Sequence, residues 1–379
     1  METPIILIPG LQGTKLTDVN RRDFKTKWSG IRAMFDNLYD LFLRADGITD
    51  AAGHIVIERE DVEDLAYKEI INFLNNEGHP VYIFGYDWRK SCRVNAVKLA
   101  EFVDVARRKN KGRGLPKVSF ITHSNGAMVL SSYLNQFKDV AEIDSIVDRM
   151  IFTAPPFLGS VEAIFNLVIG KSRLFNSSDD FRKLARTLPA IYELCPVYTG
   201  ATVRSDTNKF LLTDLLHWQK NLHGNAMMKE RLSDLESLRD DKQYIFDLDT
   251  LSATLKSKTL VIAGTGEDSQ YHFNIDNTND NHFTFPEHKL DSSKEPNGGG
   301  DGTVHQISAR AFEDSVCTLT VKSNWFETRM DSRVISYNWH SFMLNNGRVQ
   351  TIVKRFLKGP QGDNWFDTIG RGVEKVGKG

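Results

Sequence analysis

Apolar and polar positions along this chain form blocks that predict alternating strands and helices. Short apolar runs rich in valine and isoleucine, bounded by glycine, proline or aspartate, are typical of strands buried in a parallel sheet. Between them, apolar residues recur three and four positions apart, as in amphipathic helices. This alternation predicts a doubly wound α/β sheet. We expect strands at residues 4–9, 81–86, 117–121, 150–154, 258–263 and 318–321, and helices at residues 62–75, 94–108, 127–137 and 348–357.

Three stretches interrupt this alternation. Residues 14–61 form an insertion after the first strand. Residues 157–257 have helix-like patterning without strands, and they are too long for a simple crossover, so we expect a cap or lid over the active site. Residues 267–300 are polar and rich in glycine, asparagine and aspartate, which predicts a long surface loop. With residues 360–379 as a polar tail, the pattern predicts one domain over residues 1–379.

The bulk composition is that of a globular protein. Of 379 residues, 40% are hydrophobic and 26% are charged, which is enough apolar material for a large core. The formal net charge is −1 and no basic run is interleaved with aromatic residues, which argues against a nucleic-acid surface. No stretch reaches the roughly 20 apolar residues that span a bilayer, and no secretory signal is recognisable. We expect a cytoplasmic protein by default; export by a signal-independent route would leave the same amino terminus.

We expect neither a metal nor a cofactor. Two groups of residues with metal-binding side chains occur, but neither has the spacing of a metal site. They are the cysteines Cys92, Cys195 and Cys317 and the histidines His272, His282 and His288. The cysteines are predicted to be free thiols, and the histidines to lie on a loop surface.

A candidate nucleophile lies between a predicted strand and a predicted helix. The five residues Thr122–Gly126 (THSNG) follow an apolar run and precede helical patterning. Ser124 therefore matches a nucleophile elbow, in which a serine on a sharp turn needs very small residues two positions away on either side. Gly126 meets this demand, and Thr122 is a departure from the usual glycine. The alternative is an ordinary helix start with the serine as its cap.

An elbow of this kind also predicts where an oxyanion would bind. The backbone amide after the nucleophile, here that of Asn125, is one expected donor. The other comes from the loop after the first central strand, which is the glycine-containing turn at residues 9–13 (PGLQG). A P-loop is excluded because its lysine and glycine spacing is absent. His123 is expected to point away from the serine hydroxyl and to pack against the sheet.

The acid and base of such an enzyme should follow the serine in the order acid, then histidine. Two acids come after the strand at residues 258–263: Asp268 lies closer to its end, and Asp301 is flanked by glycines. Spacing alone does not choose between them. Of the two histidines that follow both acids, His305 precedes the last strand, whereas His340 follows it and precedes the final helix. His340 is the better candidate because this fold presents its histidine there.

These motifs, in this order, resemble the lecithin:cholesterol acyltransferase family, which includes lysosomal phospholipase A2 and the phospholipid:diacylglycerol acyltransferases. The resemblance extends from residue 4 to about residue 357. It rests on residues 8–16 (IPGLQGTKL), 86–89 (YDWR), the elbow at Ser124, residues 154–160 (APPFLGS), residues 300–304 (GDGTV) and His340.

The resemblance implies an α/β-hydrolase fold with an inserted helical cap. It favours Asp301 as the acid and puts the second oxyanion amide on Gln12, with Leu11 its neighbour. Trp88 and Phe157, in two of the shared motifs, become candidates for contact with the substrate. The implied membrane-contacting subdomain falls in the insertion at residues 14–61, around residues 27–30 (KWSG). Family members often have glycine at the positions of Thr122 and Ala127 and Trp-Gly at Phe157-Leu158.

The expected function is that of a lipid acyl-ester hydrolase or acyltransferase acting through an acyl-enzyme. Its partners would be a lipid or phospholipid substrate and a membrane surface touched peripherally. Apolar stripes at residues 31–43, 164–169 and 210–222 are candidates for that contact, and we expect one of them to be exposed. The alternatives are an esterase or thioesterase for small soluble substrates and a non-catalytic lipid- or partner-binding protein that keeps the fold.

Overall fold

The structure is a computed structural model. It describes residues 2–18, 26–28, 38–52, 55–112, 117–137, 139–170, 178–206, 208–240, 247–286, 299–324, 339–359, 362 and 364–378.

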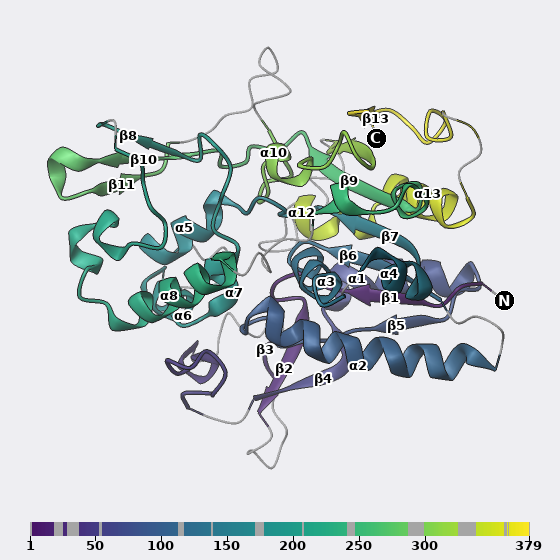
Figure 1. The fold of residues 1–379 in the computed structure, drawn as a ribbon, viewed down its shortest axis with the longest axis horizontal. Coiled ribbons are helices and arrows are strands. Elements are labelled where there is room, and N and C mark those ends of the chain that lie inside the picture. Colours follow the sequence, from purple (N-terminus) through teal and green to yellow (C-terminus); the bar gives the residue numbers. More distant parts are fainter. Residues whose placement is uncertain are drawn as a thin grey trace.

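A seven-stranded sheet forms the centre of the molecule (Figure 1). Its order is β13-β12-β9-β7-β6-β1-β5, and neighbouring strands are parallel except for the pair β12 and β13. The strands are β1 (Ile5–Ile8), β5 (Val81–Ile83), β6 (Val118–His123), β7 (Val147–Thr153), β9 (Thr259–Thr265), β12 (Cys317–Lys322) and β13 (Val373–Val376). The doubly wound, mostly parallel sheet and its six expected strands are confirmed.

Strand β13 lies in what the sequence predicted to be a polar tail. It pairs antiparallel with β12, from Thr318 opposite Val376 to Val321 opposite Val373. Its residues are half-buried or exposed, so its composition does not differ from that of a loop. The sequence analysis predicted no strand here, because an edge strand needs few apolar side chains when a neighbouring strand supplies its hydrogen bonds.

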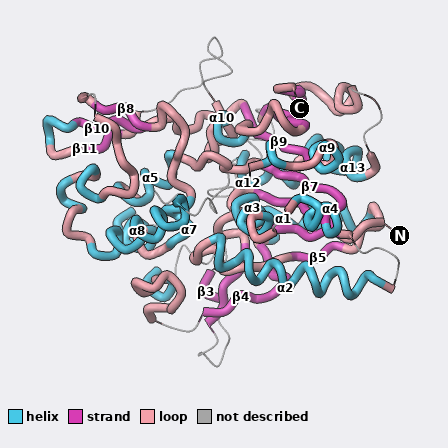
Figure 2. The backbone as a smooth tube through the Cα atoms, viewed as in Figure 1, coloured by secondary structure: helices cyan, strands magenta, loops and turns pink. Residues whose placement is uncertain are grey.

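Helices cover both faces of the sheet (Figures 1 and 2). The inner strands show why, because alternate side chains enter opposite cores. In β1, Ile5 and Leu7 belong to one buried cluster, and Ile6 and Ile8 to the other. The first cluster includes residues of α1 (Asp64–Asn76), α12 (Trp339–Phe342) and α13 (Gly347–Leu357), and the second includes residues of α2 (Cys92–Lys111), α3 (Gly126–Leu134) and α4 (Val140–Ile146). The four predicted helices correspond to α1, α2, α3 and α13.

The described part of the insertion at residues 14–61 is built mainly on a small antiparallel sheet. Its strands are β2 (Thr14–Asp18), β3 (Thr26–Trp28) and β4 (Ile55–Val62), and a short 3-10 helix, η2, covers Leu38–Leu41. Arg89 ties this insertion to the main sheet. Its buried guanidinium pairs with Asp87 at 2.8 Å and with Asp50 at 2.7 Å, and it donates to the Leu41 carbonyl. Burial alone would raise the pKa of Asp87, but the adjacent Arg89 outweighs it and lowers that pKa.

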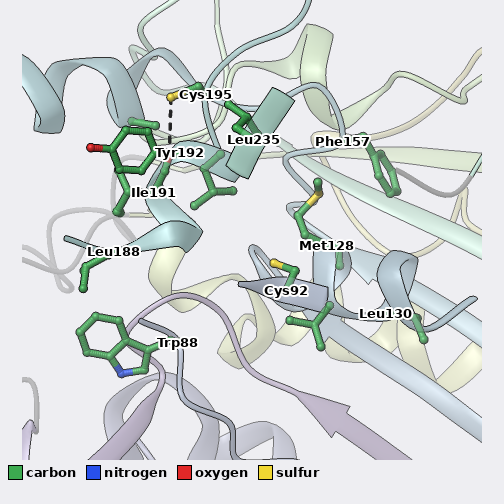
Figure 3. Packing of buried hydrophobic residues seen from close by; sticks show 14 of the residues in the cluster. Trp88, Cys92, Met128, Leu130, Phe157, Leu188, Ile191, Tyr192, Cys195 and Leu235 are labelled. Atoms are coloured by element: carbon green, nitrogen blue, oxygen red, sulfur yellow. Dashed lines mark hydrogen bonds between the residues drawn. The ribbon is translucent and has the colours of Figure 1, made fainter. Parts of the chain in front are cut away.

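Most of the helical insertion at residues 157–257 shares one core with the main sheet. Figure 3 shows Trp88, Cys92 and Met128 near Tyr192 and Leu235 of the insertion, all in one buried cluster. The insertion is therefore packed onto the sheet and is not a loosely tethered module. Its helices are α5 (Val161–Val168), α6 (Ser178–Ala185), α7 (Pro189–Glu193), α8 (Ala226–Asp240) and α9 (Ala253–Lys256), with short 3-10 helices η3 (Leu215–His217), η4 (Lys220–Leu222) and η5 (Leu248–Thr250).

A second small sheet joins the helical insertion to the segment that was expected to be a loop. Its strands are β8 (Thr202–Arg204), β10 (Phe273–Asp276) and β11 (His282–Thr284), in the order β11-β10-β8. The sequence predicted strands in neither segment, because runs of three or four residues show no measurable period. Phe273 and Phe283 bury this sheet against Phe210 and Trp218. Residues 287–298 of the expected loop, His288 included, lie outside the described residues.

The remaining described elements are short: η6 (Asn277–Asn279), α10 (Gln306–Ala309) and η7 (Met343–Asn345). The three cysteines are free thiols, as expected, and Cys92 and Cys195 are buried. Among the described residues, none of the helices combines the length and the apolar character needed to cross a bilayer.

Candidate active site

Ser124 lies on a sharp turn directly after β6. Its φ of 51° is in the left-handed region, which a residue with a side chain rarely adopts. The turn leads at once into α3, and the end of β1 with the residue that follows it leaves no room for a side chain at Gly126. A Cβ atom there would lie 2.4 Å from the Ile8 carbonyl oxygen and 2.6 Å from that of Pro9. The predicted strand-to-helix elbow is therefore present, and its glycine is sterically required.

The side chains of Ser124, His340 and Asp301 form a hydrogen-bonded chain. The Ser124 hydroxyl lies 2.8 Å from His340 Nε2, and His340 Nδ1 donates to Asp301 Oδ2 at 2.7 Å. Asp301 is 1% exposed and His340 7%. A carboxylate that accepts from Nδ1 fixes the imidazole tautomer, so Nε2 keeps the lone pair that can take the serine proton.

The backbone around Asp301 explains the glycines that flank it. Asp301 Oδ1 accepts from the amides of Thr303 (3.0 Å) and Val304 (2.7 Å), and the His340 amide donates to the Asp301 carbonyl at 3.0 Å. A Cβ on Gly300 would lie 2.1 Å from the Val304 carbonyl oxygen, and Gly302 has a φ of 90°. The loop thus turns tightly enough to aim the carboxylate at His340.

The other candidate acid and base lie elsewhere. Asp268 is exposed. His305 is buried at the start of α10, where its Nδ1 accepts from the Ile307 amide at 3.3 Å and its ring packs on Tyr271. His340 and Asp301 complete the hydrogen-bonded chain that begins at Ser124.

The residues expected to bind an oxyanion come from two neighbouring turns. Gln12 has a φ of 65° within the 9–13 turn, beside the half-buried Leu11, and Asn125 is the N-cap residue of α3. The turns touch, because a Cβ on Gly10 would lie 2.9 Å from Ser124 Cβ. The first amides of a helix have no acceptor within that helix and carry its positive dipole end. The amide of Asn125 is thus suited to stabilise a negative oxygen.

The Asn125 side chain is held by a buried polar cluster that the sequence did not suggest. Its Nδ2 donates to the Tyr86 hydroxyl at 3.3 Å, and its Oδ1 accepts from Cys92 Sγ at 3.5 Å. Tyr86 in turn donates to the Pro9 carbonyl at 3.0 Å. The cluster fastens the residue after Ser124 to the 9–13 turn. Burial raises the pKa values of Tyr86 and Cys92 well above normal, so both groups stay protonated.

Trp88 and Phe157 have packing roles in this structure. Both are completely buried. The Trp88 indole donates to the Thr14 carbonyl at 3.1 Å, and the Phe157 ring packs edge-on between Phe152 and Phe312. Neither side chain reaches the solvent-accessible surface, and both support the segments on either side of the site. Their contact with the substrate stays a prediction.

His123 and Tyr67 were not predicted as site residues, yet together they contact the backbone of His340 and the 9–13 turn. His123 Nε2 lies 2.8 Å from the His340 carbonyl oxygen, and His123 Nδ1 lies 2.8 Å from the Tyr67 hydroxyl, which also accepts from the Gly10 amide at 2.8 Å. His123 thus does more than pack against the sheet. Tyr67 lies on an ordinary amphipathic helix, and no sequence signal distinguishes it.

The model of the family described as lecithin:cholesterol acyltransferase matches residues 40–259, more than half of the chain. The protein belongs to the lecithin:cholesterol acyltransferase family. A similar curated protein is lecithin-cholesterol acyltransferase-like 4 of Arabidopsis thaliana, 24% identical over 235 residues, which are 52% of this chain. The match covers 43% of that relative, so the chain spans less than half of its length.

The fold has a counterpart among solved structures. A chain of the crystal structure of the Tle4–Tli4 complex superimposes with a TM-score of 0.60 at 13% identity, covering 95% of this chain and 99% of that one. The α/β-hydrolase fold expected for a member of the lecithin:cholesterol acyltransferase family is confirmed by this likeness and by the mostly parallel sheet.

The neutral state of His123 leads to a prediction about stability. Burial, with a further contribution from the neighbouring His340, lowers the pKa of His123 from 6.5 to about 3. Below pH 6.5 the unfolded chain therefore binds a proton at His123 that the folded chain does not bind. Acid thus destabilises the fold, and His123 lowers the free energy of unfolding by about 2 kcal/mol at pH 5. Tyr67 and Asp301 are the other titratable groups near it.

We expect the His123→Gln variant to lack this contribution. Its deficit in unfolding free energy relative to the unsubstituted protein should shrink by about 2 kcal/mol between pH 7 and pH 5. Urea unfolding at the two pH values measures this, and His282→Gln, which removes an exposed histidine, is the matched control. A deficit that stays constant with pH would contradict the prediction.

Proposed function

We propose that this protein is a serine hydrolase or acyltransferase of lipid acyl esters that works through an acyl-enzyme. The observation that carries the proposal is the chain from the Ser124 hydroxyl through His340 to Asp301, with bond lengths of 2.8 and 2.7 Å. Membership of the lecithin:cholesterol acyltransferase family supports it independently.

In the first half-reaction, Ser124 Oγ attacks the ester carbonyl carbon while His340 Nε2 takes the hydroxyl proton. Asp301 keeps the imidazole in the required tautomer and stabilises its cation. Collapse of the tetrahedral intermediate breaks the bond to the leaving alcohol, which receives the proton from His340. The acyl group is then bound to Ser124.

In the second half-reaction, His340 removes a proton from water or from an acceptor alcohol, whose oxygen attacks the acyl-enzyme. Water gives hydrolysis and an alcohol gives acyl transfer. In both halves, the backbone amides of Gln12 and Asn125 hold the oxygen that becomes negative. The strained φ of Ser124 and the start of α3 beneath it support this role, because they keep the amides oriented before the reaction begins.

A lipid substrate requires contact with a lipid surface, and the helical insertion offers one candidate. In the apolar stripe at residues 210–222, Leu211 is 54% exposed and Leu216 is 66% exposed, while Leu212, Leu215 and Trp218 are buried. In the stripe at residues 164–169, Ile169 is 42% exposed. Residues 31–37 of the third stripe lie outside the described residues. We assign peripheral membrane contact to Leu211 and Leu216 because they are the most exposed.

The central prediction concerns Ser124. A fluorophosphonate probe should label the protein, and Ser124→Ala should lose the labelling completely because, among the described residues, the hydroxyl that hydrogen-bonds to His340 Nε2 is that of Ser124. Gel fluorescence and mass spectrometry of the labelled peptide measure this. Ser132→Ala, which alters a buried serine of α3, is the matched control. Equal labelling of the protein with and without Ser124 would reject the proposal.

A second prediction separates the two candidate acids. Asp301→Asn should lower kcat on an ester substrate by roughly 10³- to 10⁴-fold, because the amide no longer holds the imidazole in the productive tautomer. Asp268→Asn should leave kcat nearly unchanged, because Asp268 is exposed and outside the hydrogen-bonded chain. Steady-state kinetics on a soluble short-chain ester decide the point. The opposite ranking would move the acid to Asp268.

The assignment of membrane contact to Leu211 and Leu216 predicts that their loss lowers activity on vesicles but not on a dissolved substrate. Replacing Leu211 and Leu216 together with serine should reduce activity on phospholipid vesicles several-fold and leave activity on a dissolved short-chain ester unchanged, because only interfacial binding loses apolar area. Val97→Ser, on the outer face of α2 and also 54% exposed, is the control. If vesicles give no advantage over the dissolved ester even for the unsubstituted protein, the substrate is a small soluble ester.

A further inference from the structure

A line of buried hydrogen bonds crosses beneath the candidate active site, and its donors can be assigned without ambiguity. The His340 carbonyl oxygen can only accept, so His123 Nε2 carries the hydrogen of that 2.8 Å bond. His123 is neutral, so its Nδ1 is an acceptor and Tyr67 donates to it at 2.8 Å. The Tyr67 oxygen accepts from the Gly10 amide at 2.8 Å. Every bond therefore points from the 9–13 turn towards His340.

The two ends of this line lie at the oxyanion turn and at His340, and the proposed reaction requires both to stay at fixed positions. Gly10 opens the turn that contains Gln12, an expected oxyanion donor, and a Cβ on Gly13 would lie 2.8 Å from the Tyr67 hydroxyl. At the other end, the His340 backbone carries the imidazole that contacts Ser124. The residues between come from α1 and from the end of β6.

Bulk water does not reach these bonds, because Tyr67 is 2% exposed and His123 4%. Removing one member leaves its neighbours without partners in a medium of low dielectric, where an unsatisfied polar group is costly. The neighbours would then shift to find new partners. Such a shift acts on the position of a catalytic group, because one end of the line is the backbone of His340 and the other lies two residues before Gln12.

We propose that Tyr67 and His123 are positioning residues that set the 9–13 turn and the backbone of His340 in one fixed arrangement around Ser124. The inference rests on the proposed function. Neither residue touches the substrate or exchanges a proton with it. The competing role is packing alone, in which case their loss lowers stability and leaves the chemical step unaffected.

Tyr67→Phe tests the proposal because it removes one oxygen and keeps the ring. We expect kcat on a soluble short-chain ester and the rate constant for fluorophosphonate labelling to fall about tenfold or more, with little change in KM. Tyr192→Phe is the matched control, since it removes a buried hydroxyl that donates to the Arg186 carbonyl within the helical insertion. Tyr192→Phe should lower the Tm by about as much as Tyr67→Phe does and leave kcat unchanged.

Substitutions of His123 add a rescue test. His123→Gln keeps an N–H group where Nε2 donates to the His340 carbonyl, whereas His123→Leu has none. We expect kcat of the glutamine variant to exceed that of the leucine variant several-fold at equal fraction folded. Combining Tyr67→Phe with His123→Leu should lower kcat little further than His123→Leu alone, because both break the same line.

A spectroscopic measurement tests the line without reference to activity. In histidine-labelled protein at pH 6, the nitrogen NMR spectrum of His123 should show a protonated Nε2 and an unprotonated Nδ1. Detection of the opposite tautomer or of a charged ring overturns the inference. So does a normal kcat in Tyr67→Phe.

The outcomes separate this inference from the proposed function. If Ser124-dependent labelling is present and Tyr67→Phe reacts normally, only the positioning role fails. If the unsubstituted protein shows no Ser124-dependent labelling, the proposed function fails and the positioning role fails with it.

Discussion

The close contact between the ends of β1 and β6 is the constraint on which the rest of the site depends. These parallel neighbours are in register, with Ile8 opposite Thr122, so the 9–13 turn and the elbow at Ser124 leave the sheet side by side. At Gly126 the backbone of one turn fills the space that a side chain would occupy on the other. Sheet hydrogen bonding therefore sets the distance between the serine and the turn that faces it, before any side chain contributes.

The acid and the histidine reach the serine because all of these segments emerge at the same edge of the sheet. Loops in this fold meet where parallel strands have their carboxyl ends. The Ser124–His340 contact spans 216 positions of sequence, and the His340–Asp301 contact spans 39. Ser160, at the start of the helical insertion, donates to the Thr303 carbonyl at 2.7 Å and so fastens the Asp301 loop to it. The helical insertion thus supports the site as well as covering part of the sheet.

Two sets of buried polar groups beside the site are hydrogen-bonded to one another. One set joins Cys92, Asn125 and Tyr86 to the Pro9 carbonyl, and another joins Gly10, Tyr67 and His123 to His340. Both sets end on the 9–13 turn. Satisfied hydrogen bonds of this kind are stronger in a low-dielectric interior than in water, and they hold a backbone in one conformation.

The sequence alone determined the alternation of strands and helices, the elbow at Ser124 and the choice of His340 from its place before the final helix. Through the family resemblance it also favoured Asp301 as the acid. Those features depend on local periodicity or on residues whose conformational demands are local, such as Gly126. Only the tertiary structure decided the edge strand β13, the small sheet of β8, β10 and β11, the burial of Trp88 and Phe157, and the line through Tyr67 and His123. These features depend on which distant segments meet, because their hydrogen-bond partners and burial come from the rest of the chain.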